Sequence, residues 1–165
     1  MRSCSALTLA GAWTPFGEVA ARALATTCAK LGLDADQEAV LQALSELPAA
    51  RDAAEAVALC EECAILTNGG LESTRALVER AGLPIETILS CEEVRAYKPS
   101  AAPYLEARER LGDCVLVAAH AWDVAGARAA GLRAIWVDRS ERTGPLAGVE
   151  PGERASSLVE AVGLV

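Results

Sequence analysis

One stretch, residues 115–128, constrains the fold of this chain more than any other. It begins with the apolar run Val-Leu-Val-Ala-Ala, passes through His120, Trp122 and Asp123, and continues as a sequence typical of a helix. A run that is apolar on both faces and leads directly into a helix is typical of a buried parallel strand. Ligands of open parallel sheets bind just beyond the carboxyl ends of the strands. These three side chains therefore stand where we expect a site.

The rest of the chain alternates short apolar runs with helical patterns. We predict strands over residues 5–10, 63–66, 87–90, 114–118 and 133–137. We predict helices over residues 16–31, 52–60, 71–81, 101–111, 122–130 and 156–162, and another that starts at Asp34 or Asp36 and ends at Leu44. This alternation predicts a Rossmann-like α/β fold, with a three-layer α/β/α arrangement and a parallel sheet. Residues 143–152, rich in glycine and proline, are predicted to form a surface loop.

Composition and charge limit the classes of protein to consider. A chain of 165 residues is most simply one domain, residues 1–165, with a proper core. The formal net charge of −8 argues against nucleic acid and against anionic membrane surfaces as partners. No apolar run has the length of a membrane span, and residues 1–9 do not resemble a signal peptide. We therefore expect a cytoplasmic protein whose six cysteines are reduced.

Polar side chains follow three of the predicted strands where each strand ends. Thr67 and Asn68 follow the second strand, Lys98 the third and Asp123 the fourth. Taken singly, each has a structural explanation as a turn, a helix cap or a solvated lysine, and His120 could be a half-buried histidine. Together, a hydroxyl, an amide, an ammonium and a carboxylate beside helix N-termini favour a site that binds anions.

The order of these motifs resembles the haloacid dehalogenase superfamily, and within it the 2-haloacid dehalogenase branch. The likeness rests on residues 66–69 (Leu-Thr-Asn-Gly), residues 94–99 (Val-Arg-Ala-Tyr-Lys-Pro) with Tyr104 beyond them, and residues 117–127. It covers approximately residues 60–139. It implies a Rossmann-like core of the type found throughout this superfamily.

The resemblance also implies roles for individual residues. Thr67 and Asn68 would bind the anionic group of the substrate. Lys98 would neutralise the nucleophile and the anion, and Asp123 would orient Lys98 or the hydrolytic water. Tyr104 would support the lysine.

One departure from the family concerns its nucleophile, an aspartate at the end of the first strand. Placing that motif on residues 6–14 puts Ala10 at the nucleophile position. Covalent aspartyl catalysis needs a carboxylate there, so ordinary dehalogenase or phosphatase turnover is not expected. The same change removes a magnesium ligand, and Asp123 beside Lys98 is a poor site for a hard dication. We expect no metal and no other cofactor.

A second departure is the length available for the helical cap domain of the family. Only residues 16–50 lie between the first two predicted strands, enough for a reduced cap of two helices. Either the pocket is open, or Trp13, Phe16 and the first helix roof it. Trp13 and Trp122 join Tyr104 as candidate substrate-binding residues.

Three functions are compatible with this pattern. The first is an enzyme of changed chemistry that binds a small carboxylate or another anionic metabolite, with Asp123 or His120 as general acid or base and Lys98 as electrostatic stabiliser. The second is a catalytically inactive family member that binds a ligand or a partner. The third is a hydrolase with a displaced nucleophile, for example Cys4. The resemblance also implies a homodimer as one possible state, since relatives in this branch are often dimers.

Overall fold

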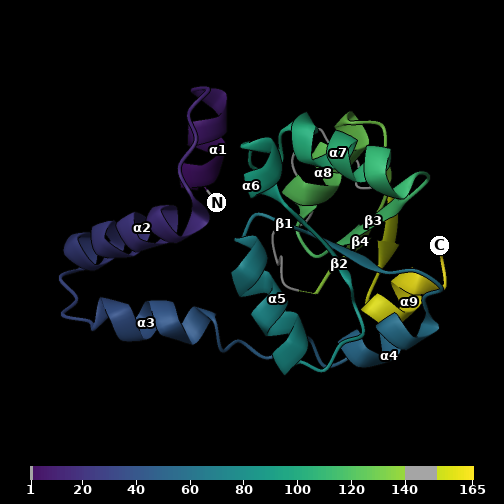
Figure 1. Cartoon of the computed structure of the whole chain (residues 1–165), viewed down its shortest axis with the longest axis horizontal. Coiled ribbons are helices and arrows are strands. Elements are labelled where there is room, and N and C mark those ends of the chain that lie inside the picture. Colours follow the sequence, from purple (N-terminus) through teal and green to yellow (C-terminus); the bar gives the residue numbers. More distant parts are fainter. Residues whose placement is uncertain (1, 140–151) are drawn as a thin grey trace.

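The strands and helices of the chain alternate over most of its length (Figure 1). A computed structural model describes residues 2–139 and 152–165. The strands are β1 (Ala64–Thr67), β2 (Thr87–Ser90), β3 (Val115–Ala118), β4 (Arg133–Val137) and β5 (Glu153–Ala155). The helices are α1 (Arg2–Leu9), α2 (Phe16–Leu31), α3 (Gln37–Leu44), α4 (Ala53–Leu59), α5 (Leu71–Arg80), α6 (Cys91–Val94), α7 (Ala101–Leu111), α8 (Ala121–Ala129) and α9 (Leu158–Val162). No helix within the described ranges has both the length and the apolar character of a membrane span.

Most of the predicted elements are confirmed, with bounds that differ by one or two residues. Asp36 caps α3, because its carboxylate accepts a hydrogen bond of 3.1 Å from the backbone N–H of Ala39. The sequence patterns missed α6 and β5, which span only four and three residues. The predicted loop over residues 143–152 lies almost entirely outside the described residues.

The predicted first strand is wrong, since residues 5–10 belong to α1 and the turn after it. A short apolar run does not separate strand from helix, and here the helical spacing dominates. Cys4 and Leu7, three residues apart, both pack against the cluster that contains Tyr97. Ala10 is exposed and follows the end of α1. The placement of Ala10 at a strand's carboxyl end, as a vacated nucleophile position, is therefore corrected.

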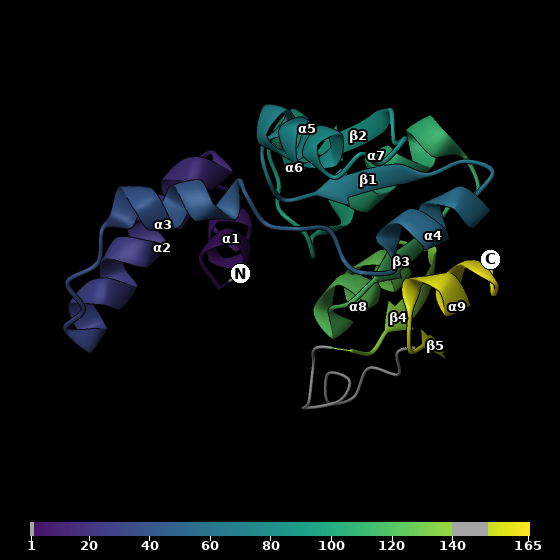
Figure 2. The same ribbon diagram turned by 90° about the horizontal axis from the view of Figure 1, so that it is seen from below.

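The strand pairings confirm a parallel α/β fold. β1 pairs with β2, β3 with β4 and β4 with β5, and all three pairings are parallel. The strands nevertheless form two sheets rather than the single sheet that we predicted, one of order β1-β2 and one of order β3-β4-β5. Figure 2 shows the two sheets with helices on either side of them.

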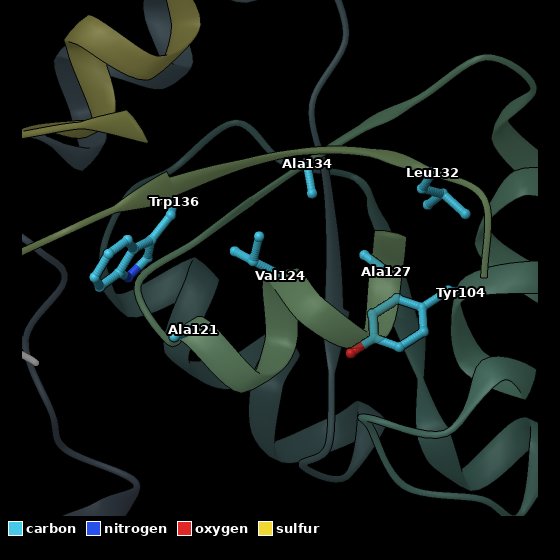
Figure 3. Close-up of a cluster of buried hydrophobic side chains, with 7 residues drawn as sticks. All are labelled: Tyr104, Ala121, Val124, Ala127, Leu132, Ala134 and Trp136. Carbon is cyan, nitrogen blue, oxygen red and sulfur yellow. The ribbon is translucent and has the colours of Figure 1, made fainter. Parts of the chain in front are cut away.

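The main hydrophobic cluster lies between α8, α7 and the second sheet (Figure 3). Val124 and Ala127 of α8 are fully buried against Trp136 of β4 and Tyr104 of α7. Leu66 of β1 packs against the same cluster, so the two sheets share one core. The helix that follows β3 is thereby fixed against β3 and β4, and its first turn is held at their carboxyl ends.

Helices α1, α2 and α3 extend to one side of the strands (Figures 1 and 2). Helices α1 and α2 are anchored by the side chains of Cys4 and Val19, which are buried against Cys91 and Tyr97. The Tyr97 hydroxyl donates a 2.6 Å hydrogen bond to the Thr14 carbonyl. This anchor lies directly before Lys98 in the chain.

The position of Asp52 before α4 suggested that its side chain caps this helix. The side chain makes no such cap and links three elements instead. Its carboxylate accepts hydrogen bonds of 2.8 and 2.7 Å from Arg139 and one of 2.7 Å from the backbone N–H of Leu158. The hydrogen bond from Arg139 holds the pKa of Asp52 below its ordinary value, and burial opposes this only in part.

We expect the substitution Asp52→Asn to lower the free energy of unfolding at pH 7 by about 1–3 kcal/mol, because hydrogen bonds to a charged group are lost. A carboxyl whose pKa is lower in the folded state stabilises the fold above its unfolded pKa and loses that effect as the pH falls through the folded pKa. The difference in free energy of unfolding between the unsubstituted chain and Asp52→Asn should therefore stay constant from pH 7 to about pH 5 and shrink below about pH 4. Urea unfolding across this pH range measures it. Glu18→Gln, in an exposed pair with Arg22, is the control with an expected change below about 0.5 kcal/mol.

Candidate functional site

Lys98 lies at the centre of the candidate site, close to the carboxyl ends of β1 and β3. Its ammonium donates a hydrogen bond of 2.7 Å to Asp123 Oδ2 in the first turn of α8 and one of 2.9 Å to the carbonyl of Leu66 in β1. The side chains of Lys98 and Asp123 are only 9% and 8% exposed. The sequence prediction that these two residues meet at the strand ends agrees with this geometry.

Asn68, directly after β1, fixes the backbone around Lys98. Its side-chain oxygen accepts a 2.8 Å hydrogen bond from the Lys98 N–H and its amide donates one of 3.3 Å to the Lys98 carbonyl. The same oxygen accepts a 3.0 Å hydrogen bond from the Cys91 thiol, whose pKa is raised by burial to about 11. In this structure Asn68 therefore positions the backbone of the lysine with its oxygen and one of its two amide N–H donors.

Tyr104 of α7 holds the second oxygen of Asp123. Its hydroxyl donates a 2.6 Å hydrogen bond to Asp123 Oδ1 and lies 3.1 Å from the Asp123 carbonyl oxygen. Burial, together with the neighbouring carboxylate, raises the pKa of Tyr104 far above its ordinary value, so the hydroxyl stays a proton donor. Tyr104 thus supports Lys98 through Asp123. Gly126, one turn along α8, leaves room for this hydroxyl and for Pro99.

Thr67, the last residue of β1, is half-buried, and its hydroxyl oxygen accepts a 2.9 Å hydrogen bond from the N–H of Gly69. The hydroxyl proton has no acceptor among residues 2–139 and 152–165, and is thus available to an anion. At the start of α5, the backbone N–H of Leu71 is already bound by Glu92 Oε2 at 3.2 Å. Of the two residues predicted to bind an anion after β1, Thr67 has a free hydroxyl proton, and Asn68 uses one of its two amide N–H donors on the Lys98 carbonyl.

The remaining predicted residues lie around this network rather than within it. His120 is exposed at the N-cap of α8 and stacks on Trp122, with ring centroids 5.3 Å apart. Trp13, from the loop after α1, stacks on Tyr97 at 4.6 Å. Sequence reasoning missed Tyr97, which joins the helices α1 and α2 to the site; its position directly before Lys98 was the available signal.

Comparison with known proteins identifies the family. Residues 9–131 match the family model of haloacid dehalogenase-like hydrolases. The chain belongs to this family.

Several characterised dehalogenases are similar to this chain. Haloacetate dehalogenase H-2 of Moraxella sp. (strain B) is 31% identical over 144 residues, which are 79% of this chain and 64% of the relative. An (S)-2-haloacid dehalogenase of Pseudomonas sp. (strain YL) is 32% identical over 164 residues, which are 90% of this chain and 70% of the relative. The chain thus spans about two thirds of the length of these relatives, and only 47% of (S)-2-haloacid dehalogenase 2 of Pseudomonas sp. (strain CBS-3).

A solved structure supports the same family. The L-2-haloacid dehalogenase of Xanthobacter autotrophicus with covalently bound chloropropionic acid superposes with a TM-score of 0.89 at 25% identity. The match covers 99% of this chain and 80% of the dehalogenase. The haloacid dehalogenase-like fold predicted from the motif order is therefore confirmed.

The donors around Lys98 do not fit the divalent cation that phosphatases of this family use. A hard dication needs several oxygen ligands, usually carboxylates. Here the Asp123 carboxylate is occupied by an ammonium and a phenol. No group of three or more histidine, cysteine, aspartate or glutamate side chains in the described part of the chain could hold a metal ion.

Cys4, the displaced nucleophile considered from the sequence, is unsuited to that role. It is 2% exposed in the cluster around Tyr97, and burial raises its pKa. A nucleophilic cysteine needs a lowered pKa and an accessible thiolate. The geometry therefore argues against attack by this thiol.

Proposed function

We propose that this haloacid dehalogenase-like chain binds a small carboxylate at Lys98. The observation that carries the proposal is the number of hydrogen bonds that the ammonium makes. An ammonium has three N–H donors, and that of Lys98 uses two, toward Asp123 and Leu66. The third donor and the free hydroxyl proton of Thr67 supply the two contacts that an incoming carboxylate needs. The names of the relatives, which act on haloacetate and on (S)-2-haloacids, support 2-halocarboxylates as the ligand class.

We favour binding without covalent catalysis. Both oxygens of Asp123 are engaged, by Lys98 and by Tyr104, so this carboxylate is held as a positioning group. A catalytic alternative assigns proton transfer to Asp123 and His120, with Lys98 stabilising negative charge. The observation in its favour is that the Lys98–Asp123–Tyr104 network is buried and fully formed, which strengthens its electrostatic effect on a bound anion.

We further propose that residues 16–50 act as a reduced cap over this site. Support comes from the packing of Trp13 and Phe16 with the cluster around Tyr97, the residue that precedes Lys98. The aromatic side chains would restrict access of water to a bound carboxylate.

The experiment is a calorimetric titration with (S)-2-chloropropionate and with propionate, with chloride measured in the same samples. We expect dissociation constants of about 0.1–10 mM, no chloride release, and loss of binding in Lys98→Met. The matched control is Lys30→Met, because Lys30 is the other lysine of the chain and is exposed on α2. Unchanged binding in Lys98→Met would contradict the proposal. Chloride release that Asp123→Asn abolishes would favour the catalytic alternative.

A further inference from the structure

Two cysteines form a close pair outside the network around Lys98. Cys60 directly follows α4 and Cys63 directly precedes β1, and the chain bends at both residues between them. Burial raises the pKa of the Cys63 thiol, and so do the charge and the hydrogen bonding of the neighbouring Cys60 thiol. Both cysteines are free thiols and are half-buried, which leaves them within reach of a small molecule in solution. Two thiols therefore meet at an accessible position.

The other four cysteines have different surroundings. Three of them, Cys4, Cys28 and Cys91, are at most 5% exposed. Cys114, before β3, is half-buried, packs against the main hydrophobic cluster and has no second cysteine near it in the sequence. Of the six cysteines, only the pair at residues 60 and 63 combines access from solvent with a second thiol two residues away.

The segment between the two cysteines suits a disulfide bond. A disulfide requires Cα atoms less than about 7 Å apart and side chains that face each other. The bends at Glu61 and Glu62 bring the ends of this four-residue segment together. The Cys60 thiol donates a 3.3 Å hydrogen bond to the Ala56 carbonyl, one turn back along α4. Oxidation would remove the proton of that hydrogen bond, which is a small loss because a thiol is a weak donor.

We propose that Cys60 and Cys63 form a reversible disulfide by exchange with small disulfides of the glutathione class. The thiolate of one cysteine attacks a sulfur of oxidised glutathione, which breaks that S–S bond, forms a mixed disulfide and releases one reduced glutathione. The thiolate of the other cysteine then attacks the protein sulfur of the mixed disulfide and releases the second reduced glutathione. The cysteine pair loses two electrons and two protons, and the two released glutathione molecules carry them.

The position of the pair indicates which form is favoured. Strongly oxidising cysteine pairs lie at helix N-termini, where the reduced thiolate is stabilised. Cys60 lies instead at the C-terminal end of α4, where the helix dipole disfavours negative charge. The pKa of Cys63 is also raised. The reduced form thus gains no stabilised thiolate, so the disulfide should persist once it is formed. Its formation should be slow, because the attacking group is a thiolate.

The bond would fasten the end of α4 to the start of β1. Helix α4 packs beside α9 (Figures 1 and 2), and Asp52 holds its start through Arg139 and the backbone of Leu158. Thr67 of the candidate site lies four residues beyond Cys63, about 13 Å along an extended strand. Oxidation should therefore stiffen the junction of α4 and β1 without blocking the candidate site, and the proposal does not depend on carboxylate binding.

The experiment incubates the freshly reduced full chain with reduced and oxidised glutathione at about 1 mM each until equilibrium, then quenches with acid and alkylates in denaturant. We expect most of the chain to lose two of its six thiols, with the disulfide located by mass spectrometry in a peptide that contains residues 60–63. Dithiothreitol should restore all six thiols. The oxidised chain should melt about 2–6 °C higher, because the bond constrains the unfolded chain.

Cys60→Ser and Cys63→Ser should each abolish the internal disulfide and leave glutathione attached to the remaining cysteine of the pair. The matched control is Cys114→Ser, which removes a half-buried cysteine before another strand and should leave the disulfide unchanged. Oxidation of less than about one tenth of the unsubstituted chain, or a disulfide between other cysteines, would overturn the proposal, and neither result depends on the folding of a variant. An unchanged melting temperature would contradict the stiffening of the junction.

Discussion

Gly126→Ala should lower the free energy of unfolding by about 2–4 kcal/mol, because the new methyl group enters a space that is already filled. A Cβ at this position of α8 would lie 2.7 Å from the Tyr104 hydroxyl oxygen and 2.8 Å from both the Cβ and the carbonyl oxygen of Pro99. Two of these three atoms belong to the backbone-constrained proline that follows Lys98, so the clash cannot be relieved by rotating a flexible side chain. Relief requires α8 to move away from α7.

The displacement should also reach the candidate site, since Tyr104 holds Asp123 and Pro99 adjoins Lys98. We expect a fall in melting temperature of about 5–12 °C in thermal unfolding and weaker carboxylate binding in the folded fraction. The matched control is Gly17→Ala, a second helical glycine, at which an added Cβ would meet nothing within 4 Å. It should stabilise the chain slightly, by about 0.5–1 kcal/mol. Equal effects of the two substitutions would contradict the steric argument.

The part of the fold that was predictable from sequence is the part in which local patterns and tertiary packing agree. The apolar run before His120 is long enough, and apolar enough on both faces, to indicate a buried parallel strand. β3 confirms the parallel strand, although its four residues are half-buried rather than buried. Residues 5–10 lack such a signal: a six-residue apolar run fits strand and helix equally, and packing of Cys4 and Leu7 against Tyr97 favours the helix.

The candidate site was predictable as a set of residues, but not as a set of roles. The topology of parallel strands places Lys98 and Asp123 together, and this follows from counting strand ends. Which side chains bind one another does not follow from that count. The Asn68 side chain, for example, bonds the backbone N–H and carbonyl of Lys98, a contact between residues 30 positions apart that no local pattern indicates. The division into two sheets was not predicted; the sequence patterns indicated one sheet with a strand over residues 5–10, where the chain forms α1 instead.

Lys98→Met should cost about 3–5 kcal/mol of stability, because it leaves the carboxylate of Asp123 buried without its positive partner. The Tyr104 hydroxyl would remain as a hydrogen-bond donor but would not neutralise the charge. Asp123→Asn should cost less, about 2–3 kcal/mol, since an amide oxygen still accepts from Lys98 while its charge is uncompensated. In the double variant both charges are absent, and the total cost should therefore be smaller than the sum of the two single effects.

The coupling energy from this double-mutant cycle separates a true buried pair from two independent contacts. We expect a coupling energy of at least about 2 kcal/mol, measured by urea unfolding. The dependence of the free energy of unfolding on urea concentration should be the same in all four proteins of the cycle. The reference cycle is Glu18→Gln with Arg22→Met, because this pair is exposed and its nitrogen and oxygen lie 3.7 Å apart. Its coupling should stay below about 0.5 kcal/mol. If the effects of the Lys98 and Asp123 substitutions are additive, the site does not have a low dielectric constant. The argument that the Lys98 ammonium strongly stabilises a bound carboxylate would then fail as well.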